Sequence, residues 1–355
     1  YGLKIENYSK DFDAVINRSR NVASGMSKGV NFLMKKNKID VINGYGKIKS
    51  GKKVEVKKDD GEIIDLQGKN IIIATGSKSR ILPSLPQDGK KIIGYREAMT
   101  LDSQPKKIII VGSGAIGIEF AYFYNTMGSE VTIIEYQDRI VPQEDKEISK
   151  ALETIFKKNG IKVFTSSELI NSKTKGKTVT AIIKTAKKEQ ILNADIVLSA
   201  VGVKSNIDNI GLEDVGIVSD NDKIIVDDFY QTNIPGYFAI GDITKGQALA
   251  HVASAEGILC VEKLAGLNIE PLDYENIPGC TYSYPEIASV GLTEDQAKDR
   301  GYKIKVGKFP FSASGKAQAS GKSEGFVKVI FDAKYGEWLG CHMIGAGVTD
   351  MISEA

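Results

Sequence analysis

The sequence has few cysteines, almost no net charge and no long apolar run, and each of these scarcities excludes a class of protein. Its three cysteines, Cys260, Cys280 and Cys341, are odd in number and far apart, which argues against a disulfide framework and against a zinc site. With 47 basic and 45 acidic residues, it indicates no nucleic-acid or membrane partner. No apolar run approaches the roughly 20 residues of a transmembrane helix, and we see no signal peptide. We expect a reducing, cytoplasmic location and no metal.

Residues 107–135 have the pattern of a dinucleotide site. Lys107–Val111 predicts a buried strand, and Gly112, Gly114 and Gly117 follow it as GxGxxG. The first glycine permits a tight turn, the second lets the backbone approach a pyrophosphate, and the third lets the helix pack closely on the strand. The phosphates then lie at a helix N-terminus. The alternative is a glycine-rich turn in an ordinary α/β domain.

Apolar spacing predicts a helix after these glycines. Ile116, Phe120, Phe123 and Met127 recur at intervals of four, three and four residues, so we expect them to form the buried face. Val131–Ile134 then predicts the next strand.

An acidic residue, Glu135, ends that strand. A carboxylate in this place accepts hydrogen bonds from an adenosine ribose 2′-hydroxyl and repels a 2′-phosphate, which favours NAD over NADP. Arg139 offers an alternative contact for a phosphate, but an exposed arginine is more often a solvated loop charge.

The N-terminal region begins on a helix. Val15, Val22, Met26, Val30 and Leu33 recur at helical spacing, and no strand precedes them. Because an α/β domain of this kind ordinarily opens on a strand, the N-terminus looks truncated. The rest of the pattern predicts a linker at 81–86, a helix at 145–158, and strands at 39–42, 52–56, 62–66, 70–75, 161–164, 178–184, 190–192 and 195–201, with short strands within 223–242.

A second glycine and acid pair follows a strand at Gly241 and Asp242. This would place a carboxylate at the carboxyl edge of a parallel sheet, where open α/β folds bind ligands and where it can hold a polyol hydroxyl. Ala74, Thr75 and Gly76 end another buried strand in the same manner. The alternative is a common turn.

These segments resemble a known family. GSGAIGIEFA with Glu135, ATGS at 74–77, NIPGYFAIGD at 233–242, LAHVASAEG at 249–257 and IPGCTYSYPEIASVGLTE at 277–294 are similar to the flavoprotein pyridine nucleotide-disulfide oxidoreductases, and within them to the dihydrolipoamide dehydrogenases. KFPFSASGKAQA at 308–319 resembles the opening of their dimerisation domain. The resemblance covers practically the whole chain.

The resemblance implies an α/β fold with two Rossmann-like, doubly wound domains for FAD and NAD(P) and an α+β dimerisation domain. The implied boundaries are a partial FAD-binding domain at 1–101, an NAD-binding domain at 102–222, a return to the FAD-binding or central domain at 223–275 and a partial dimerisation domain at 276–355.

In the last domain we expect a helix at 293–301, N-capped by Thr293 with Gln296 three residues later, and strands at 281–284, 304–310, 327–331 and 339–344.

It also implies two sets of cofactor-binding residues. The NAD set is Gly112, Ser113, Gly114, Ala115, Ile116, Gly117, Ile118, Glu119, Glu135, Leu169 and Gly202. The FAD set is Gly46, Ala74, Thr75, Gly76, Ser77, Asp242, Ala248, Leu249, Ala250 and His251.

Two members of these sets have other readings. The resemblance implies that Glu119 faces the nicotinamide, whereas a carboxylate near a positive helix end is otherwise worth only about 0.5 kcal/mol. His251 suggests a general base, but the resemblance places it beside the flavin. His342 lies in an expected strand, where a structural role is the simpler interpretation.

The sequence departs from the family in the residues that perform catalysis. It contains no N-terminal GxGxxG, no CxxxxC redox pair and no C-terminal His-Glu pair. A single cysteine cannot close a disulfide by exchange, and Cys260 and Cys280 are too far apart in sequence to replace the pair. We therefore expect a chain truncated at both ends, with no catalytic residue present, weakened or absent FAD binding and no turnover.

For the complete protein the resemblance implies oxidation of protein-bound dihydrolipoamide, with FAD and with NAD as acceptor. The implied partners are a lipoyl-bearing protein of a 2-oxoacid dehydrogenase or glycine cleavage complex and a second copy in a homodimer. One alternative is another, NADPH-dependent disulfide reductase resembling mercuric or glutathione reductase. The other is a non-catalytic truncated NAD-binding protein.

Overall fold

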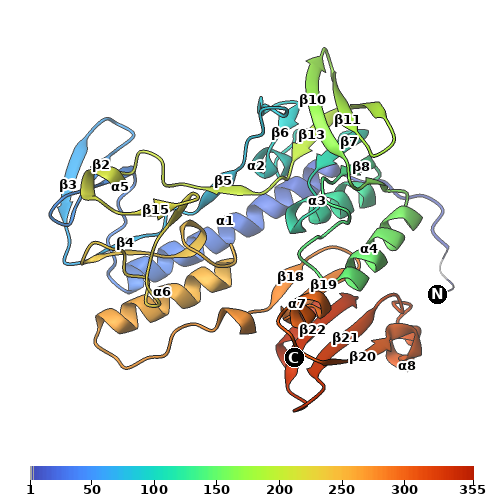
Figure 1. Cartoon of the computed structure of the whole chain (residues 1–355). Helices are drawn as coiled ribbons and strands as arrows, with labels where there is room; N and C mark the ends of the chain where they lie inside the picture. The colour runs from blue at the N-terminus through green and yellow to red at the C-terminus, as the bar shows by residue number, and fades with distance from the viewer. Residues whose placement is uncertain (1, 3) are drawn as a thin grey trace. The chain divides into compact units, whose positions relative to one another are not determined.

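The computed structural model of the protein describes residue 2 and residues 4–355. The chain forms two compact units, each assembled from segments that are not contiguous (Figure 1). Unit 1 contains the chain up to Asn21 and the segments 79–202 and 275–355, and unit 2 contains 22–78 and 203–274. The domain boundaries expected at 101, 222 and 275 remain predictions, because unit 1 joins the expected NAD-binding segment to the C-terminal segment.

A parallel five-stranded sheet forms the first layer of unit 1. Its strands lie in the order β6 (Ile92–Ile93), β13 (Ile196–Ser199), β7 (Lys107–Val111), β8 (Glu130–Ile134) and β9 (Lys162–Phe164). Four successive residues of β7 are buried, as in strands covered on both faces. The crossovers carry α3 (Ala115–Thr126) and α4 (Lys146–Lys158), which confirms the expected Rossmann-like arrangement. The short helix α2 (Tyr95–Ala98) follows β6.

The buried face of α3 differs from the expected one. Gly117, Ile118, Ala121 and Tyr124 are its buried residues, whereas Ile116, Phe120 and Phe123 are only half-buried. Phe120 and Phe123 each lie one position before a buried residue, whereas Met127, just after the helix, is buried as expected. The small residues Gly117 and Ala121 on the buried face allow the helix to approach the sheet closely, and Phe120 and Phe123 pack against the core only in part.

A three-stranded antiparallel sheet interrupts the parallel one between β9 and β13. It contains β10 (Glu168–Lys175), β11 (Thr178–Lys184) and β12 (Glu189–Ala194). The sequence predicted β11 and β12 but missed β10, because only Leu169 in that strand is buried and the rest is polar.

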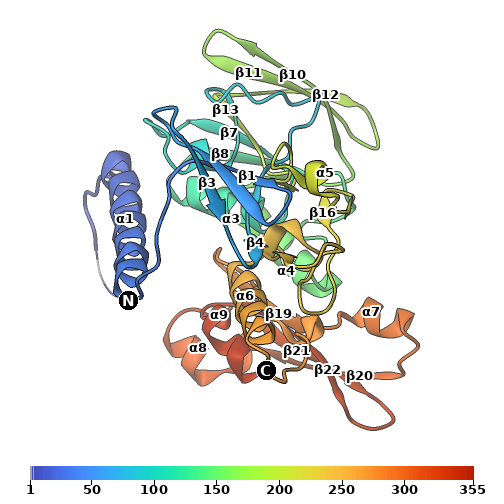
Figure 2. The ribbon, with the colours of Figure 1, turned by 90° about the vertical axis from the view of Figure 1, so that its left-hand side faces the viewer.

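The second layer of unit 1 is the C-terminal sheet, drawn in orange and red in Figure 2. Five antiparallel strands lie in the order β18 (Gly279–Thr281), β19 (Glu286–Gly291), β22 (Trp338–Gly345), β21 (Phe326–Asp332) and β20 (Ile304–Pro310). The helices are α7 (Glu294–Asp299), α8 (Gly315–Ala319) and α9 (Val348–Met351). The predicted capping box of Thr293 and Gln296 is confirmed. The sequence missed β19 and placed β18 too far along the chain.

One hydrophobic core joins the two layers of unit 1. Ile287 of β19 and Ile344 of β22 belong to the same buried cluster as Ile110 of β7 and Ile118 of α3. The C-terminal sheet therefore packs against the parallel sheet through a shared core and is not joined to it by the chain alone.

Unit 2 contains small sheets and a long helix around its own core. Ile71, Ile73 and Tyr237 lie in that core. One antiparallel sheet contains β1 (Tyr45–Lys49), β2 (Lys53–Lys57) and β3 (Ile63–Gln67). Three further pairs of strands are β4 (Ile71–Ile73) with β17 (Tyr237–Ala239), β5 (Ser77–Ser79) with β14 (Val203–Ser205), and β15 (Ser219–Asp220) with β16 (Lys223–Ile224). The helices are α5 (Leu212–Val215) and α6 (Ala250–Leu264). The strand expected at 39–42 is wrong, since these residues are irregular.

Helix α1 (Phe12–Lys36) confirms the expected N-terminal helix, and its apolar stripe is exposed. Phe12 is its only buried residue among those described. Met26 is 71% exposed and Val30 is 54% exposed. The periodicity therefore predicted the helix correctly, but the apolar side chains that form the stripe remain exposed in the described structure.

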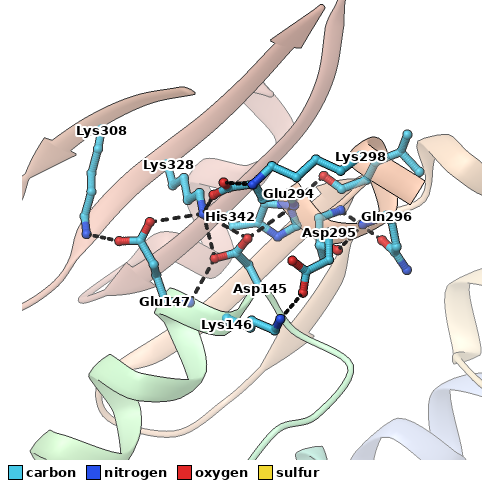
Figure 3. Close-up of polar contacts among 12 residues, drawn as sticks. Asp145, Lys146, Glu147, Glu294, Asp295, Gln296, Lys298, Lys308, Lys328 and His342 are labelled. Atoms are coloured by element: carbon cyan, nitrogen blue, oxygen red, sulfur yellow. Dashed lines mark hydrogen bonds and ion pairs between the residues drawn. The ribbon is translucent and has the colours of Figure 1, made fainter. Parts of the chain in front are cut away.

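A buried lysine joins α4 to the C-terminal sheet (Figure 3). Lys328 of β21 is 1% exposed, and its Nζ lies 2.9 and 3.0 Å from the two carboxylate oxygens of Asp145. Glu294 lies 2.7 Å from the same nitrogen and Glu147 lies 3.1 Å from it. Burial lowers the pKa of Lys328, but its hydrogen bonds to Glu294 and Asp145 outweigh this and raise the pKa above its ordinary value.

Replacing this lysine tests the buried ion cluster. We expect Lys328→Met to lower the free energy of unfolding by about 3–5 kcal/mol, because Asp145 stays buried without its cation. The measurement is urea unfolding. The matched control is Lys146→Met, since Lys146 is 62% exposed and lies 2.7 Å from Asp295, and its loss should cost less than about 1 kcal/mol. Equal costs for the two variants would contradict the assignment.

A neighbouring carboxyl is buried without full compensation. Glu144 Oε2 has no hydrogen-bond partner. Burial raises the pKa of Glu144 to about 6, although a hydrogen bond from Ser289 opposes the rise and Asp145 adds to it. The folded pKa is above the unfolded one, so this carboxyl costs no stability below about pH 4.5 and progressively destabilises the fold as the pH rises through 6.

We expect Glu144→Gln to remove this pH dependence. Above pH 6 the variant should be more stable than the parent by about 2 kcal/mol, because the neutral amide is not penalised by burial. Urea unfolding of both proteins between pH 4.5 and 8 measures the difference. Curves that stay parallel over this range would show that Glu144 does not titrate there.

Candidate functional site

The turn after β7 leaves an open position at its centre. Gly112 has a φ of +98°, and a Cβ there would lie 2.3 Å from the carbonyl oxygen of Ala200. A Cβ at Gly117 would lie 2.1 Å from the carbonyl oxygen of Gly112. A Cβ at Gly114 would meet nothing within 4 Å. The fold itself thus requires two of the three glycines, and the third faces free space at the start of α3.

The first amides of α3 have no side-chain cap. Gly114 is the N-cap residue, and no side chain bonds to the amides that follow. Gly114 and Ala115 are exposed. Unpaired amides at a helix N-terminus bind anions, so this end suits a phosphate group.

Glu135 is joined directly to this turn. It directly follows β8 and is 7% exposed. Its Oε2 accepts hydrogen bonds from the Ser113 amide at 2.8 Å and from the Ser113 hydroxyl at 2.6 Å. Its Oε1 accepts a hydrogen bond from the Gln137 amide at 2.8 Å. The structure therefore brings the predicted glycines and the predicted acid together.

Arg139 differs from the expected solvated charge. It is half-buried, its Nη1 lies 3.0 Å from Asp138 Oδ1, and its Nη2 donates to the carbonyl oxygen of Pro142 at 3.3 Å. These contacts hold the side chain against its own loop.

The other NAD candidates in unit 1 lie around the same sheet. The side chains of Ile118 and Leu169 are buried in two different cores, and Ile116 is half-buried. Gly202 follows β13 with a φ of +96°, and its carbonyl oxygen accepts the Arg80 amide at 3.0 Å.

Glu119 has a contact that the sequence did not indicate. Its Oε1 accepts the amide of Tyr282, at the end of β18, at 2.8 Å. Burial raises the pKa of Glu119 above its ordinary value, and the bond from Tyr282 partly opposes the rise. The carboxyl thus links α3 to the C-terminal sheet.

Two strand ends meet in unit 2, as the sequence predicted. β4 and β17 run parallel, so Ala74 to Ser77 and Asp242 emerge at the same edge. Ser77 Oγ donates to Asp242 Oδ2 at 2.5 Å. Thr75 Oγ1 donates to the carbonyl oxygen of Asn206 at 2.7 Å. Gly46, by contrast, is exposed in β1, which belongs to a different sheet.

A buried acid, Glu256, supports the Gly241 turn from α6. Its Oε2 accepts the Gly241 amide at 2.5 Å, and its Oε1 accepts the hydroxyl of Tyr274 at 2.6 Å. A Cβ at Gly241 would lie 3.2 Å from the Cβ of Ala253, so α6 passes close to the turn. The sequence did not single out this acid.

The remaining FAD candidates open α6. Leu249 is its half-buried N-cap residue, and Ala248, Ala250 and His251 are exposed. The other histidine, His342, is 1% exposed with Nε2 at 2.9 Å from the carbonyl oxygen of Leu292, which fits a structural role.

The two candidate sets fall into different units. All NAD candidates belong to unit 1 and all FAD candidates to unit 2. Over the described residues, no three His, Cys, Asp or Glu side chains are grouped to hold a metal ion. The helices described there include none of the length and apolarity that a membrane span needs.

Comparison with known families identifies the fold. Residues 3–257 match the family described as pyridine nucleotide-disulphide oxidoreductase, and residues 277–355 match its dimerisation domain. The chain belongs to this family. The matches confirm the expected fold class, and dihydrolipoyl dehydrogenases of the family use FAD and NAD.

Curated relatives are dihydrolipoyl dehydrogenases. The enzyme of Rhizobium etli is 46% identical, and the match covers 99% of this chain and 77% of the relative. The enzyme of Bacillus subtilis is also 46% identical, and the match covers 100% of this chain and 77% of the relative. The crystal structure of LpdA from Mycobacterium tuberculosis superposes with a TM-score of 0.91 at 25% identity, covering 98% of this chain and 77% of that one. The chain is thus similar to dihydrolipoyl dehydrogenases over about three quarters of their length.

The glycine turn generates a paired prediction for stability. We expect Gly117→Ala to lower the free energy of unfolding by about 1–3 kcal/mol, because the new Cβ overlaps the Gly112 carbonyl. Gly114→Ala should cost less than about 1 kcal/mol, since its Cβ enters free space and only the N-cap preference is lost. Urea unfolding of the two variants checks this. Equal losses would contradict the geometry of the turn.

Proposed function

We propose that this protein is a dihydrolipoyl dehydrogenase, which oxidises the dihydrolipoyl group of a partner protein and uses NAD as electron acceptor. The sequence similarity to enzymes of that name supports the proposal. FAD, when bound, supplies the electron transfer between the dithiol and NAD.

The observation that carries the proposal is the buried Glu135 beside the glycine turn. A carboxylate at this position binds a ribose hydroxyl and repels a 2′-phosphate, so it favours NAD. The NADPH-dependent alternative would need a cation there, and the next arginine along the chain, Arg139, is bonded to Asp138 and Pro142 instead.

The NAD residues divide by the part of the dinucleotide that each would hold. The α3 amides that follow Gly114 would bind the diphosphate, and Glu135 the adenosine ribose. Leu169 would lie beside the adenine. Glu119 and Gly202 would lie near the nicotinamide half. The open space at Gly114 and the uncapped helix start fit a diphosphate.

The FAD residues in unit 2 fit part of the flavin. Asp242 would hold the ribityl chain, oriented by the Ser77 hydroxyl, and Ala74 to Gly76 would pass close to it. Gly46 would meet the adenine, and Ala248 to His251 the pyrimidine edge. Glu256 would hold the Gly241 turn in place through its amide.

No dithiol step is assigned to a residue of this chain. Its cysteines, at 260, 280 and 341, include no pair with CxxxxC spacing. The residues present bind and orient nucleotides.

We infer a lipoyl-bearing protein of a 2-oxoacid dehydrogenase or glycine cleavage complex as partner, and a homodimer through the dimerisation domain. The family match over residues 277–355 supports the dimer. We infer a cytoplasmic location, supported by three unpaired cysteines of which Cys260 and Cys341 are buried.

Nucleotide titration tests the NAD assignment. The purified chain should bind NADH at least about tenfold more tightly than NADPH, a difference of about 1.4 kcal/mol. Nucleotide fluorescence measures both affinities. Gly114→Ala should weaken NADH binding by at least about tenfold while the far-ultraviolet circular dichroism stays unchanged. Equal affinity for the two nucleotides would favour the NADPH-dependent alternative.

The lipoyl assignment is tested on the protein expressed from its complete gene. Dihydrolipoamide should reduce NAD in the presence of bound flavin. A protein that instead oxidises NADPH with glutathione disulfide or mercuric ion would contradict the proposed substrate.

A further inference from the structure

Ser113, between the first two glycines, is the most heavily bonded residue of the turn. It is completely buried. Its amide and its hydroxyl both donate to Glu135 Oε2, at 2.8 and 2.6 Å. Its carbonyl oxygen accepts the amide of Val141 at 3.0 Å. One side chain therefore connects the phosphate turn to the acid at the end of the neighbouring strand.

These bonds determine which carboxylate oxygen of Glu135 stays available. An ionised carboxylate offers about four acceptor positions, two on each oxygen. On Oε2 the two bonds from Ser113 occupy both positions. On Oε1 the Gln137 amide occupies one and leaves one. Hydrogen bonds to both oxygens thus hold the carboxylate, and the one acceptor position that stays free is on Oε1.

We propose that Ser113 is a positioning residue for nucleotide specificity, which orients Glu135 so that its remaining acceptor position receives the ribose 2′-hydroxyl of NAD. This inference rests on the proposed function. The hydroxyl of Ser113 keeps the negative charge of Glu135 fixed at the turn, where a 2′-phosphate would be repelled. Without that hydroxyl, Oε2 keeps only the Ser113 amide, so the carboxylate is held less firmly and both the attraction for NAD and the repulsion of NADP weaken.

The geometry allows the hydroxyl to be removed alone. In Ser113→Ala the two backbone bonds, to Glu135 and from Val141, are kept because they use the amide and the carbonyl. Only the short hydroxyl bond is lost. A hydrogen bond to a charged group is stronger than one between neutral groups, so we expect its loss to change the ratio of the NADH and NADPH affinities by about tenfold.

The test is the ratio of the NADPH and NADH dissociation constants, measured by nucleotide fluorescence. We expect Ser113→Ala to lower this ratio about tenfold. The matched control is Ser149→Ala, because Ser149 is 1% exposed and its hydroxyl donates to the carbonyl oxygen of Val141 at 3.2 Å without touching Glu135. The ratio of the control should equal that of the parent.

A double variant separates positioning from a general loss of structure. In a Glu135→Ala background, Ser113→Ala should leave the ratio unchanged, because the serine acts only through the acid. If the parent prefers NADH and Ser113→Ala has the same ratio as the parent, whether or not both affinities fall, the inference is overturned while the proposed function stands. A parent without preference for NADH overturns both.

Discussion

The nucleotide end of unit 1 depends on one close approach, between Gly117 in α3 and the carbonyl oxygen of Gly112. No side chain fits between them, so the helix begins directly against the end of β7. This brings the uncapped helix start beside the end of β8, which Glu135 directly follows. The bonds between Ser113 and Glu135 then close the turn. Sterics at one glycine thus place the amides proposed to bind the diphosphate beside Glu135, the acid proposed to bind the ribose.

Local sequence signals identified the elements that carry this turn. β7 has the bounds expected from its apolar run, β20 has the expected bounds of 304–310, and the cap of α7 follows from Thr293 and Gln296. Prediction failed where local pattern and tertiary environment differ. β10 is mostly polar, and α3 buries Gly117, Ile118, Ala121 and Tyr124 rather than Phe120 and Phe123. Which face of a helix is buried depends on how closely the neighbouring sheet can approach it. The spacing of apolar residues within the helix carries no information about that distance.

The candidate site was predictable in its glycines and acids but not in its supporting bonds. The pairing of Ser77 with Asp242 follows from two strands that end at the same edge, so the topology indicates it. Glu119 with Tyr282 and Lys328 with Asp145 join positions more than 160 residues apart. Such pairs depend on how layers stack, and nothing in the local sequence of either partner specifies the other. The sequence indicated Ser113 only as a member of the glycine motif and did not predict the hydrogen bond from its hydroxyl to Glu135.

The division of the chain into interleaved segments constrains how it is made. The polypeptide passes between the units after Asn21, after Lys78, after Gly202 and after Tyr274. Neither unit is therefore a continuous stretch that a single gene deletion or one proteolytic cut could isolate. During synthesis, unit 2 cannot close until Tyr274 has left the ribosome, and the first layer of unit 1 waits for β13, since β7 lies between β13 and β8. Meanwhile β4 waits for β17 and β6 waits for β13, which exposes the edges of these two strands to association with other chains.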